Sequence, residues 1–166
     1  MLFEKFGEFD SPEELNKAAA GLKAEGDMAS LKLLGKENGI DEDDIQDYMD
    51  GIVDELVTPL SMAVGRLMLE KADISEEKNV AERTVLNIIL ESAEALAMLD
   101  ASVERGICKK GMRIKDIATA MKDYARKHAA GSIGVACGTD RQLTQIIMAY
   151  YLGQDLQATL NKIMER

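Results

Sequence analysis

Residues 76–99 read EEKNVAERTVLNIILESAEALAML, and this stretch decides the fold class. It predicts the longest helix of the chain. Its middle, residues 85–90, is apolar almost all round, so we expect this helix to be the central buried element. The whole composition agrees, because Ala, Leu, Met, Glu and Lys dominate the 166 residues and proline occurs only twice. The chain is therefore predicted to be mostly α.

On the N-terminal side of this helix, the sequence predicts four shorter helices. Ser11-Pro12-Glu13-Glu14 is a strong helix start, because Ser11 can cap, Pro12 suits the first turn and Glu14 completes a capping box. Capping residues also begin the next three helices: Asp27, Asp41 and Thr58. Glycines end the first three helices: Gly26, Gly39 and Gly51.

The best candidate for a linker is residues 71–78, just before the long helix. We therefore divide the chain into an acidic helical N-terminal part, residues 1–72, and a helical C-terminal part, residues 73–166. At 166 residues, the chain fits one domain or two very small ones.

Beyond the long helix, the pattern predicts a basic helix, a short extended segment and two further helices. In the basic helix, residues 113–127, four apolar residues recur at helical spacing, with the bases on the other side; they are Ile114, Ile117, Met121 and Tyr124. Residues 132–137 are short and β-branched, which indicates a buried extended segment. Thr139 and Gln142 form a capping box that begins the next helix, and a short last helix follows.

Charge is distributed unevenly along the chain, whose net charge is −10. Residues 1–56 hold 16 acidic residues against 5 lysines, whereas residues 57–166 hold 14 acidic and 15 basic residues. Within the second part, residues 102–127 carry eight bases and three acids. This asymmetry favours an electropositive partner for the N-terminal part. The alternative is that the acid only keeps the protein soluble.

Known catalytic and metal-binding motifs are not matched. The acidic run that begins at Asp41 fails as an EF-hand, because Ile45 and Gln46 stand where the loop needs an oxygen ligand and a glycine. The glycine-rich segment 131–139 has no lysine before its threonine, so it does not match a phosphate loop. A nucleophilic pair of Cys108 and His128 stays open as an alternative. We expect no enzyme activity, no cofactor and no metal.

Four aspartates provide the strongest signal for a binding site. Their spacings of 4, 3 and 4 place them on one face of a helix, provided that the helix continues through Gly51. They would span roughly 16 Å, a length in which one DNA strand carries about five phosphates. The four aspartates, Asp43, Asp47, Asp50 and Asp54, therefore predict a partner-binding surface that competes with a phosphate backbone for a groove lined by Lys and Arg. Three neighbouring acids, Glu42, Asp44 and Glu55, belong to the same predicted surface.

Two alternatives weaken this hypothesis. A break at Gly51 would leave only Asp43, Asp47 and Asp50 aligned. An ordinary exposed helix face would also show this spacing.

The location is predicted to be cytoplasmic. No run of eighteen apolar residues occurs, so we expect no membrane span, and the first ten residues mix charges into apolar residues, unlike a signal peptide. The two cysteines, Cys108 and Cys137, are then expected to be free thiols.

Part of the C-terminal half resembles the PcfK-like family of mobile-element proteins, which includes anti-CRISPR inhibitors of Cas9. The similar segments are VERGICKKGM at residues 103–112, ATAMKDYARK at 118–127, GVACGTD at 134–140 and IIMAYYLG at 146–153. The N-terminal stretch FEKFGEFDSPEEL, residues 3–15, looks like the opening of small proteins from the same class of elements.

The resemblance implies a mobile-element protein, from a phage or plasmid, that blocks a host defence nuclease. The predicted function is inhibition of Cas9 by direct binding to Cas9 or its guide RNA complex in the host cytosol. The alternative is a conjugation or plasmid-maintenance accessory protein, which would touch DNA or a relaxase through residues 105–127. Direct nucleic-acid binding is not expected elsewhere, and a homo-oligomer is left open.

Overall fold

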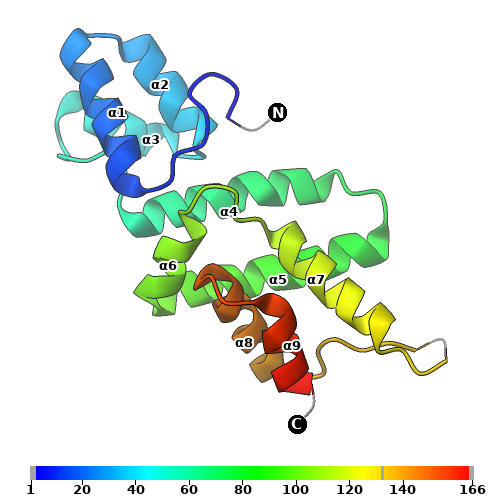
Figure 1. Cartoon of the computed structure of the whole chain (residues 1–166). Helices are drawn as coiled ribbons and strands as arrows, with labels where there is room; N and C mark the ends of the chain where they lie inside the picture. The colour runs from blue at the N-terminus through cyan, green and yellow to red at the C-terminus, as the bar shows by residue number, and fades with distance from the viewer. Residues whose placement is uncertain (1–2, 132, 165–166) are drawn as a thin grey trace.

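The computed structural model describes residues 3–131 and 133–164, where it contains helices and no β-strand (Figure 1). The fold class predicted from the sequence, mostly α, is thereby confirmed. In this part of the chain there are nine helices: α1 (Pro12–Glu25), α2 (Met28–Glu37), α3 (Glu42–Asp50), α4 (Pro59–Ser75), α5 (Val80–Leu99), α6 (Ala101–Ile107), α7 (Ile114–Lys127), α8 (Asp140–Tyr151) and α9 (Leu156–Met164).

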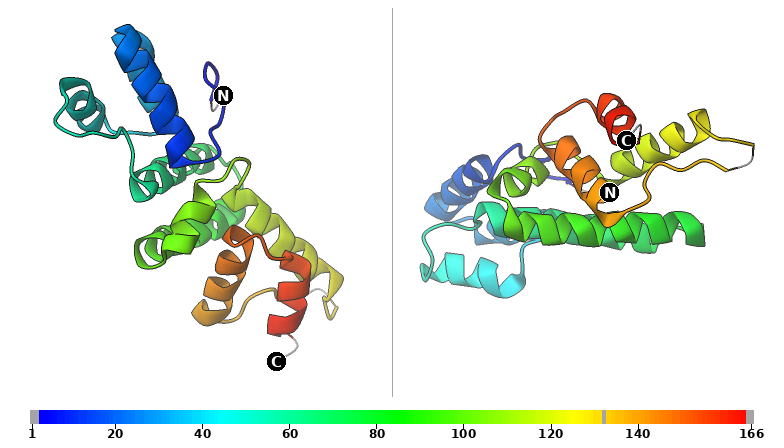
Figure 2. Two further views of the ribbon diagram at one scale, coloured as in Figure 1. Left: turned by 60° about the vertical axis from the view of Figure 1, so that its left-hand side comes forward. Right: turned by 90° about the horizontal axis from the view of Figure 1, so that it is seen from below.

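The C-terminal elements form two layers. Helices α4 and α5 make an antiparallel hairpin, and α5 also packs against α6, α7 and α8. Seen from below, α5 runs along one side of the molecule, with α7, α8 and α9 on the other (Figure 2). It contacts four other helices, as expected of the element around which the fold is built. The burial of α5 on all sides, expected from the sequence, is not found, because Val85 and Ile88 are exposed.

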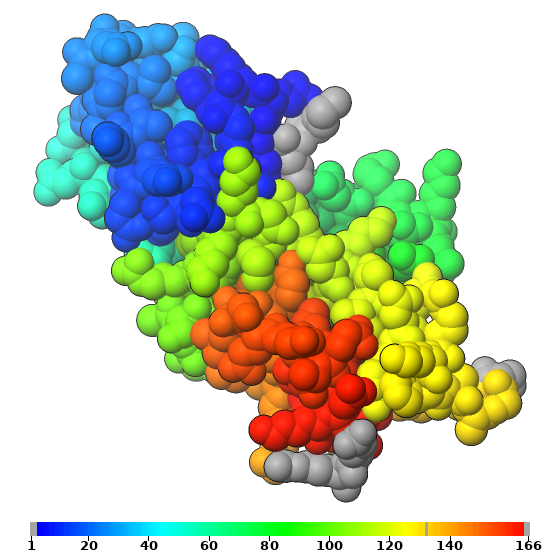
Figure 3. All heavy atoms as spheres, viewed as in Figure 1, coloured from blue at the N-terminus to red at the C-terminus, as the bar shows by residue number. Residues whose placement is uncertain are grey.

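The first three helices form a smaller unit at one end of the molecule (Figure 3), where α2 packs against both α1 and α3. The division predicted at residue 72 falls inside α4, a helix that packs with α5 and α6. The change of packing partners instead lies in residues 51–58. One continuous hydrophobic core nevertheless joins the two parts, from Leu15 in α1 to Leu160 in α9.

A close backbone crossing attaches the N-terminal unit to α4. Gly39, which follows α2 with a φ of 71°, lies against Gly65 in α4. A Cβ on Gly65 would lie 2.6 Å from the carbonyl oxygen of Asn38, so no side chain fits there without a shift of backbone. Nearby, the amide of Asn16 donates to the Val57 carbonyl at 2.8 Å and accepts from the Val57 N–H at 2.9 Å.

A buried ion network joins the N-terminal segment to α4 and to the start of α7. The carboxylate of Glu8 accepts two hydrogen bonds of 2.8 Å from the Arg113 guanidinium and lies 3.4 Å from Nη1 of Arg66. Arg66 is itself buried and donates to the carbonyls of Phe9, Ile107 and Lys109. Three chain segments therefore meet at the Arg66 guanidinium: residues 8–9, helix α4 and residues 107–109.

The local predictions for the C-terminal part have mixed outcomes. In α7 three of the four predicted apolar residues, Ile114, Ile117 and Tyr124, are buried and Met121 is half-buried, while the Lys and Arg side chains are exposed. The buried extended segment predicted at residues 132–137 is not confirmed. Ser132 lies outside the described residues, and Ile133 and Val135 are exposed, whereas Gly134 lies closely against the Ala125 carbonyl of α7 and Ala136 is buried.

Candidate partner-binding surface

Helix α3 begins and ends at residues that the sequence makes recognisable. The carboxylate of Asp41 caps it by accepting from the N–H of Asp43 at 2.9 Å. Gly51, with a φ of 74°, ends it, and the following N–H of Ile52 donates back to the Asp47 carbonyl at 2.9 Å. This left-handed glycine ending turns the chain away from the helix axis.

The apolar side of α3 fixes which side chains face the solvent. Ile45 and Tyr48 are buried, and Ile45 packs so closely on α2 that a Cβ on Gly35 would lie 2.5 Å from its Cδ1 atom. At 100° per residue, the opposite side of the helix carries Asp43, Asp47 and Asp50. These three aspartates form one acidic face.

The break at Gly51 removes part of the predicted stripe. Asp54 and Glu55 lie in the exposed connection between α3 and α4, not on the helix. The aligned face is therefore about 10 Å long, which matches about three phosphates of a single strand. The remaining predicted acids, Glu42 and Asp44, lie in the first turn of α3. We define the acidic α3 surface as all seven residues: Glu42, Asp43, Asp44, Asp47, Asp50, Asp54 and Glu55.

Most of this acid is not paired with a cation. Glu42 lies 3.6 Å from Nζ of Lys32 and 3.7 Å from Nζ of Lys36. The other six carboxylates make no ion pair within the described part of the chain. Across the same residues, no group of three His, Cys, Asp or Glu side chains could hold a metal ion. The surface therefore carries separate negative charges.

The helix dipole accounts for the positions of the acids at the start of α3, but not for those at its end. A helix has a partial positive charge at its N-terminus and a partial negative charge at its C-terminus. Glu42, Asp43 and Asp44 stand at the favourable end, but Asp47 and Asp50 stand in the last turn, where a carboxylate is unfavourable. Lys23 offsets this in part, because its ammonium donates to the Tyr48 carbonyl there. Asp47 and Asp50 thus weaken α3 rather than stabilise it.

The basic region of residues 105–127 differs from the acidic surface, because half of its cations have a carboxylate partner. The pairs join Arg105 to Glu13, Arg113 to Glu8, Lys122 to Glu82 and Arg126 to Asp123, at 2.8–3.8 Å. The side chains of the other four bases make no ion pair among the described residues; they are Lys109, Lys110, Lys115 and Lys127.

The start of α7 is capped by side chains from other helices, which local sequence reasoning did not predict. Glu70 of α4 accepts from the N–H of Ile114 at 2.7 Å, and the Tyr150 hydroxyl accepts from the N–H of Arg113 at 2.8 Å. The same hydroxyl donates to Asp116 at 2.7 Å. Glutamates and tyrosines far away in the sequence give no local signal for this role.

Two carboxylates near this junction have shifted pKa values of opposite sign. Burial raises the pKa of Glu70 to about 7, although the N–H of Ile114 and the charge of Arg113 act to lower it. Burial also acts to raise the pKa of Glu8, but hydrogen bonds from Arg113 and from the backbone of Gly111, with the charges of both arginines, lower it overall.

The alternative catalytic pair of Cys108 and His128 is not brought together. Cys108 is buried, and its thiol donates to the Pro59 carbonyl at 3.3 Å. Burial raises the pKa of this thiol to about 12, so it stays protonated at neutral pH. His128 instead stacks on Tyr124, with ring centroids 4.1 Å apart. Both cysteines are free thiols, as predicted.

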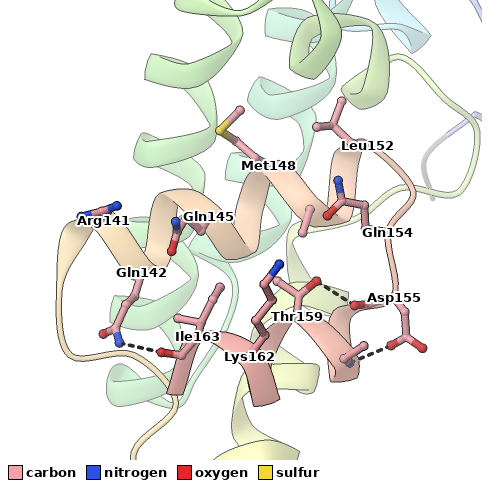
Figure 4. Close-up of a pocket in the computed structure, with 12 residues that line it drawn as sticks. Arg141, Gln142, Gln145, Met148, Leu152, Gln154, Asp155, Thr159, Lys162 and Ile163 are labelled. Carbon is pink, nitrogen blue, oxygen red and sulfur yellow. Dashed lines mark hydrogen bonds between the residues drawn. The ribbon is translucent and has the colours of Figure 1, made fainter. Parts of the chain in front are cut away.

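An open hollow of about 720 Å³ lies between α8 and α9 (Figure 4). The Gln142 amide of α8 donates to the Ile163 carbonyl of α9 at 3.4 Å, and Asp155 caps α9 by accepting from the N–H of Ala158 at 3.0 Å. No histidine, cysteine or serine is among the residues that line it. Its polar lining residues include Asp155, Thr159 and Lys162.

Comparisons with known proteins add no relative. No protein-family model, no curated protein and no solved structure is significantly similar to this chain. Across residues 3–131 and 133–164, no helix combines the length and the hydropathy needed to cross a membrane.

Proposed function

We propose that this protein binds Cas9, or the Cas9–guide RNA complex, through the acidic α3 surface and thereby inhibits the nuclease. The observation that carries the binding site is the set of unpaired carboxylates, which includes Asp47 and Asp50 at the end of α3 where they are unfavourable for the helix. The choice of Cas9 rests on the resemblance of the C-terminal half to the PcfK-like family. The predicted place of action is the host cytosol.

The physical basis of inhibition is competition between carboxylates and phosphates. A groove that holds a nucleic-acid strand is lined by Lys and Arg, because phosphate contacts supply most of the affinity. Three aligned carboxylates, with the loop acids Asp54 and Glu55 beside them, present a similar line of negative charge. Such a surface would also accelerate association by electrostatic steering. No catalytic step is required of the inhibitor.

The test is co-elution with the Cas9–guide complex, together with inhibition of DNA cleavage, for a few Cas9 orthologues. The double variant Asp47→Lys/Asp50→Lys should stay folded and lose most of both activities. The matched control, Lys122→Glu/Arg126→Glu, reverses two exposed charges of α7 and should retain them. The proposal fails if the parent neither co-elutes with nor inhibits any of the orthologues.

A conjugation or plasmid-maintenance accessory protein is the second candidate, favoured by the exposed basic side of α7. Lys115, Lys122 and Arg126 lie within about 40° of one another around this helix. This function would use the basic region of residues 105–127 to contact DNA or a relaxase. An electrophoretic shift of DNA by the parent, abolished in the Lys122→Glu/Arg126→Glu variant, would support it in place of Cas9 inhibition.

A further inference from the structure

A small cavity lies where the C-terminal half of α4, the first half of α5 and the start of α7 come together. Its volume is about 220 Å³, which is below the range of about 300–1,000 Å³ that is usual for the sites of drug-sized ligands. The cavity therefore has room for a small molecule only.

Opposite charges line this cavity from two different parts of the fold. Helix α4 and the turn after it supply three carboxylates, those of Glu70, Asp73 and Glu77. The start of α7 supplies the two cations, Arg113 and Lys115. Within residues 3–131 and 133–164, no ion pair joins these carboxylates to these cations. The separated charges leave room for a ligand that carries both signs.

The fold already uses some of these groups and not others. Both terminal nitrogens of Arg113 donate to a carboxylate outside the cavity. The carboxylates of Glu70 and Glu77 each accept one backbone N–H, at 2.7 Å and 3.0 Å. The side chains of Asp73 and Lys115 are exposed and make no hydrogen bond or ion pair in the described part of the chain. Asp73 and Lys115 are therefore the carboxylate and the ammonium that can bind a ligand at the least cost to the fold.

The remaining lining of the cavity is apolar. It consists of Ile74 from α4 and Leu86 from α5, which are both buried. A short aliphatic group placed against them would be removed from water, which is favourable. The lining thus combines a negative side, a positive side and an apolar wall.

We propose that this cavity binds a free α-amino acid with a small aliphatic side chain. Its ammonium group lies against Asp73, its carboxylate against Lys115, and its side chain against Ile74 and Leu86. A simple cation or a simple anion would satisfy one side only, whereas a zwitterion makes charge-assisted hydrogen bonds on both sides. None of these residues belongs to the acidic α3 surface, so the site is independent of the proposed function.

The first test compares three ligands of the same carbon skeleton by NMR titration of the full-length protein. L-Valine is the probe, isobutylamine is valine without its carboxylate, and 3-methylbutanoate is valine without its amine. L-Valine should bind, and each of the other two should bind at least about tenfold more weakly, since each lacks one set of hydrogen bonds between charged groups.

The second test assigns each charge of the ligand to one side of the cavity. Asp73→Asn should weaken the binding of L-valine and leave that of 3-methylbutanoate unchanged, because that ligand has no ammonium. Lys115→Met should weaken the binding of L-valine and leave that of isobutylamine unchanged. Both side chains are exposed, so the variants should stay folded. Glu76→Gln and Lys127→Met change exposed residues outside the cavity and are the matched controls, which should bind L-valine like the parent.

Three results would overturn the proposal. The first is no saturable binding of L-valine by the parent at concentrations up to about 10 mM. The second is binding of isobutylamine as tight as that of L-valine, which would make the cavity a site for simple cations. The third is undiminished binding of L-valine by both Asp73→Asn and Lys115→Met.

Discussion

Helices α3 and α7 are both amphipathic and strongly charged on their outer sides, but the structure uses their charges differently. Among residues 105–127, which include α7, half of the cations are paired with carboxylates, and the N-terminus of α7 is capped by Glu70 and Tyr150 from neighbouring helices. On α3, the acids are mostly unpaired, and Asp47 and Asp50 oppose the helix dipole. A charged run indicates a binding surface only when its charges are not already satisfied within the fold.

The largest expected loss of stability comes from removing the carboxylate of Glu8, which connects the start of α7 to the buried Arg66. Glu8→Ala would leave the buried Arg66 without its carboxylate and Arg113 without its two hydrogen bonds. Removing one partner of a buried ion pair costs about 3–5 kcal/mol, so the variant should unfold at much lower denaturant concentration. Glu13→Ala, which removes an exposed pair with Arg105, is the control and should melt like the parent. Equal melting of the two variants would show that the network does not hold α7.

The next largest loss of stability is expected at the crossing of Gly39 and Gly65, where helices α1–α3 are attached to α4. Gly65→Ala would place a Cβ 2.6 Å from the Asn38 carbonyl oxygen, so α4 and the turn after α2 must move apart. We expect a loss of about 1–3 kcal/mol and faster amide hydrogen exchange in α1–α3 than in α5. Gly21→Ala is the control, because nothing lies near its Cβ and alanine favours a helix. That variant should be slightly stabilised.

The pH dependence of stability tests the cap of α7. The pKa of Glu70 is about 7 in the folded protein and near 4.5 in the unfolded chain, so the folded state binds this proton more tightly. Its contribution, about 1–3 kcal/mol, is present below pH 4.5 and declines as the pH rises toward 7. Glu8, whose pKa is lowered, acts in the opposite direction as the pH falls below 4.5.

Urea unfolding of the parent and of Glu70→Gln between pH 4 and 8 measures this contribution. The glutamine keeps an acceptor for the Ile114 N–H but carries no proton that titrates. The decline between pH 4.5 and 7 should therefore be smaller in Glu70→Gln than in the parent. Identical profiles would mean that Glu70 titrates normally.

The smallest effect on stability concerns the acids of α3. Asp50→Asn removes a carboxylate from the end of the helix where it is unfavourable, and should stabilise the protein by a few tenths of a kcal/mol. Asp44→Asn removes one from the favourable end and should destabilise it by a similar amount. Chemical denaturation of both variants checks the sign. Destabilisation by Asp50→Asn would show that this acid has a structural role.

The sequence predicted what depends on neighbouring residues. Helix starts at Ser11, Asp27, Asp41, Thr58 and Thr139 were predicted because a capping side chain bonds to a backbone N–H only two or three residues away. The end of α3 at Gly51 was also anticipated as a possible break in the acidic stripe, because a glycine that ends a helix is likewise a local signal. Most of the acidic surface was therefore accessible to sequence reasoning.

The sequence did not predict what depends on residues far apart along the chain. Glu8 and Arg113 are separated by 105 residues, and neither has a local pattern that marks it as buried. The exposed residues Val85 and Ile88 of α5 were expected to be buried, because an apolar run does not show which side of a helix faces the core. Likewise, the β-branched residues Ile133 and Val135 suggested burial, but both side chains are exposed.

The central claim is that the unpaired acid of α3, and not the base of α7, contacts the nuclease. The most direct measurement is the affinity for the Cas9–guide complex as a function of salt, for the parent and both reversed variants. The parent should bind more weakly as salt rises. Asp47→Lys/Asp50→Lys should bind at least about tenfold more weakly at low salt, since reversal replaces attraction with repulsion, and its salt dependence should be flatter. Lys122→Glu/Arg126→Glu should match the parent. A folded Asp47→Lys/Asp50→Lys variant that binds as tightly as the parent would contradict the claim.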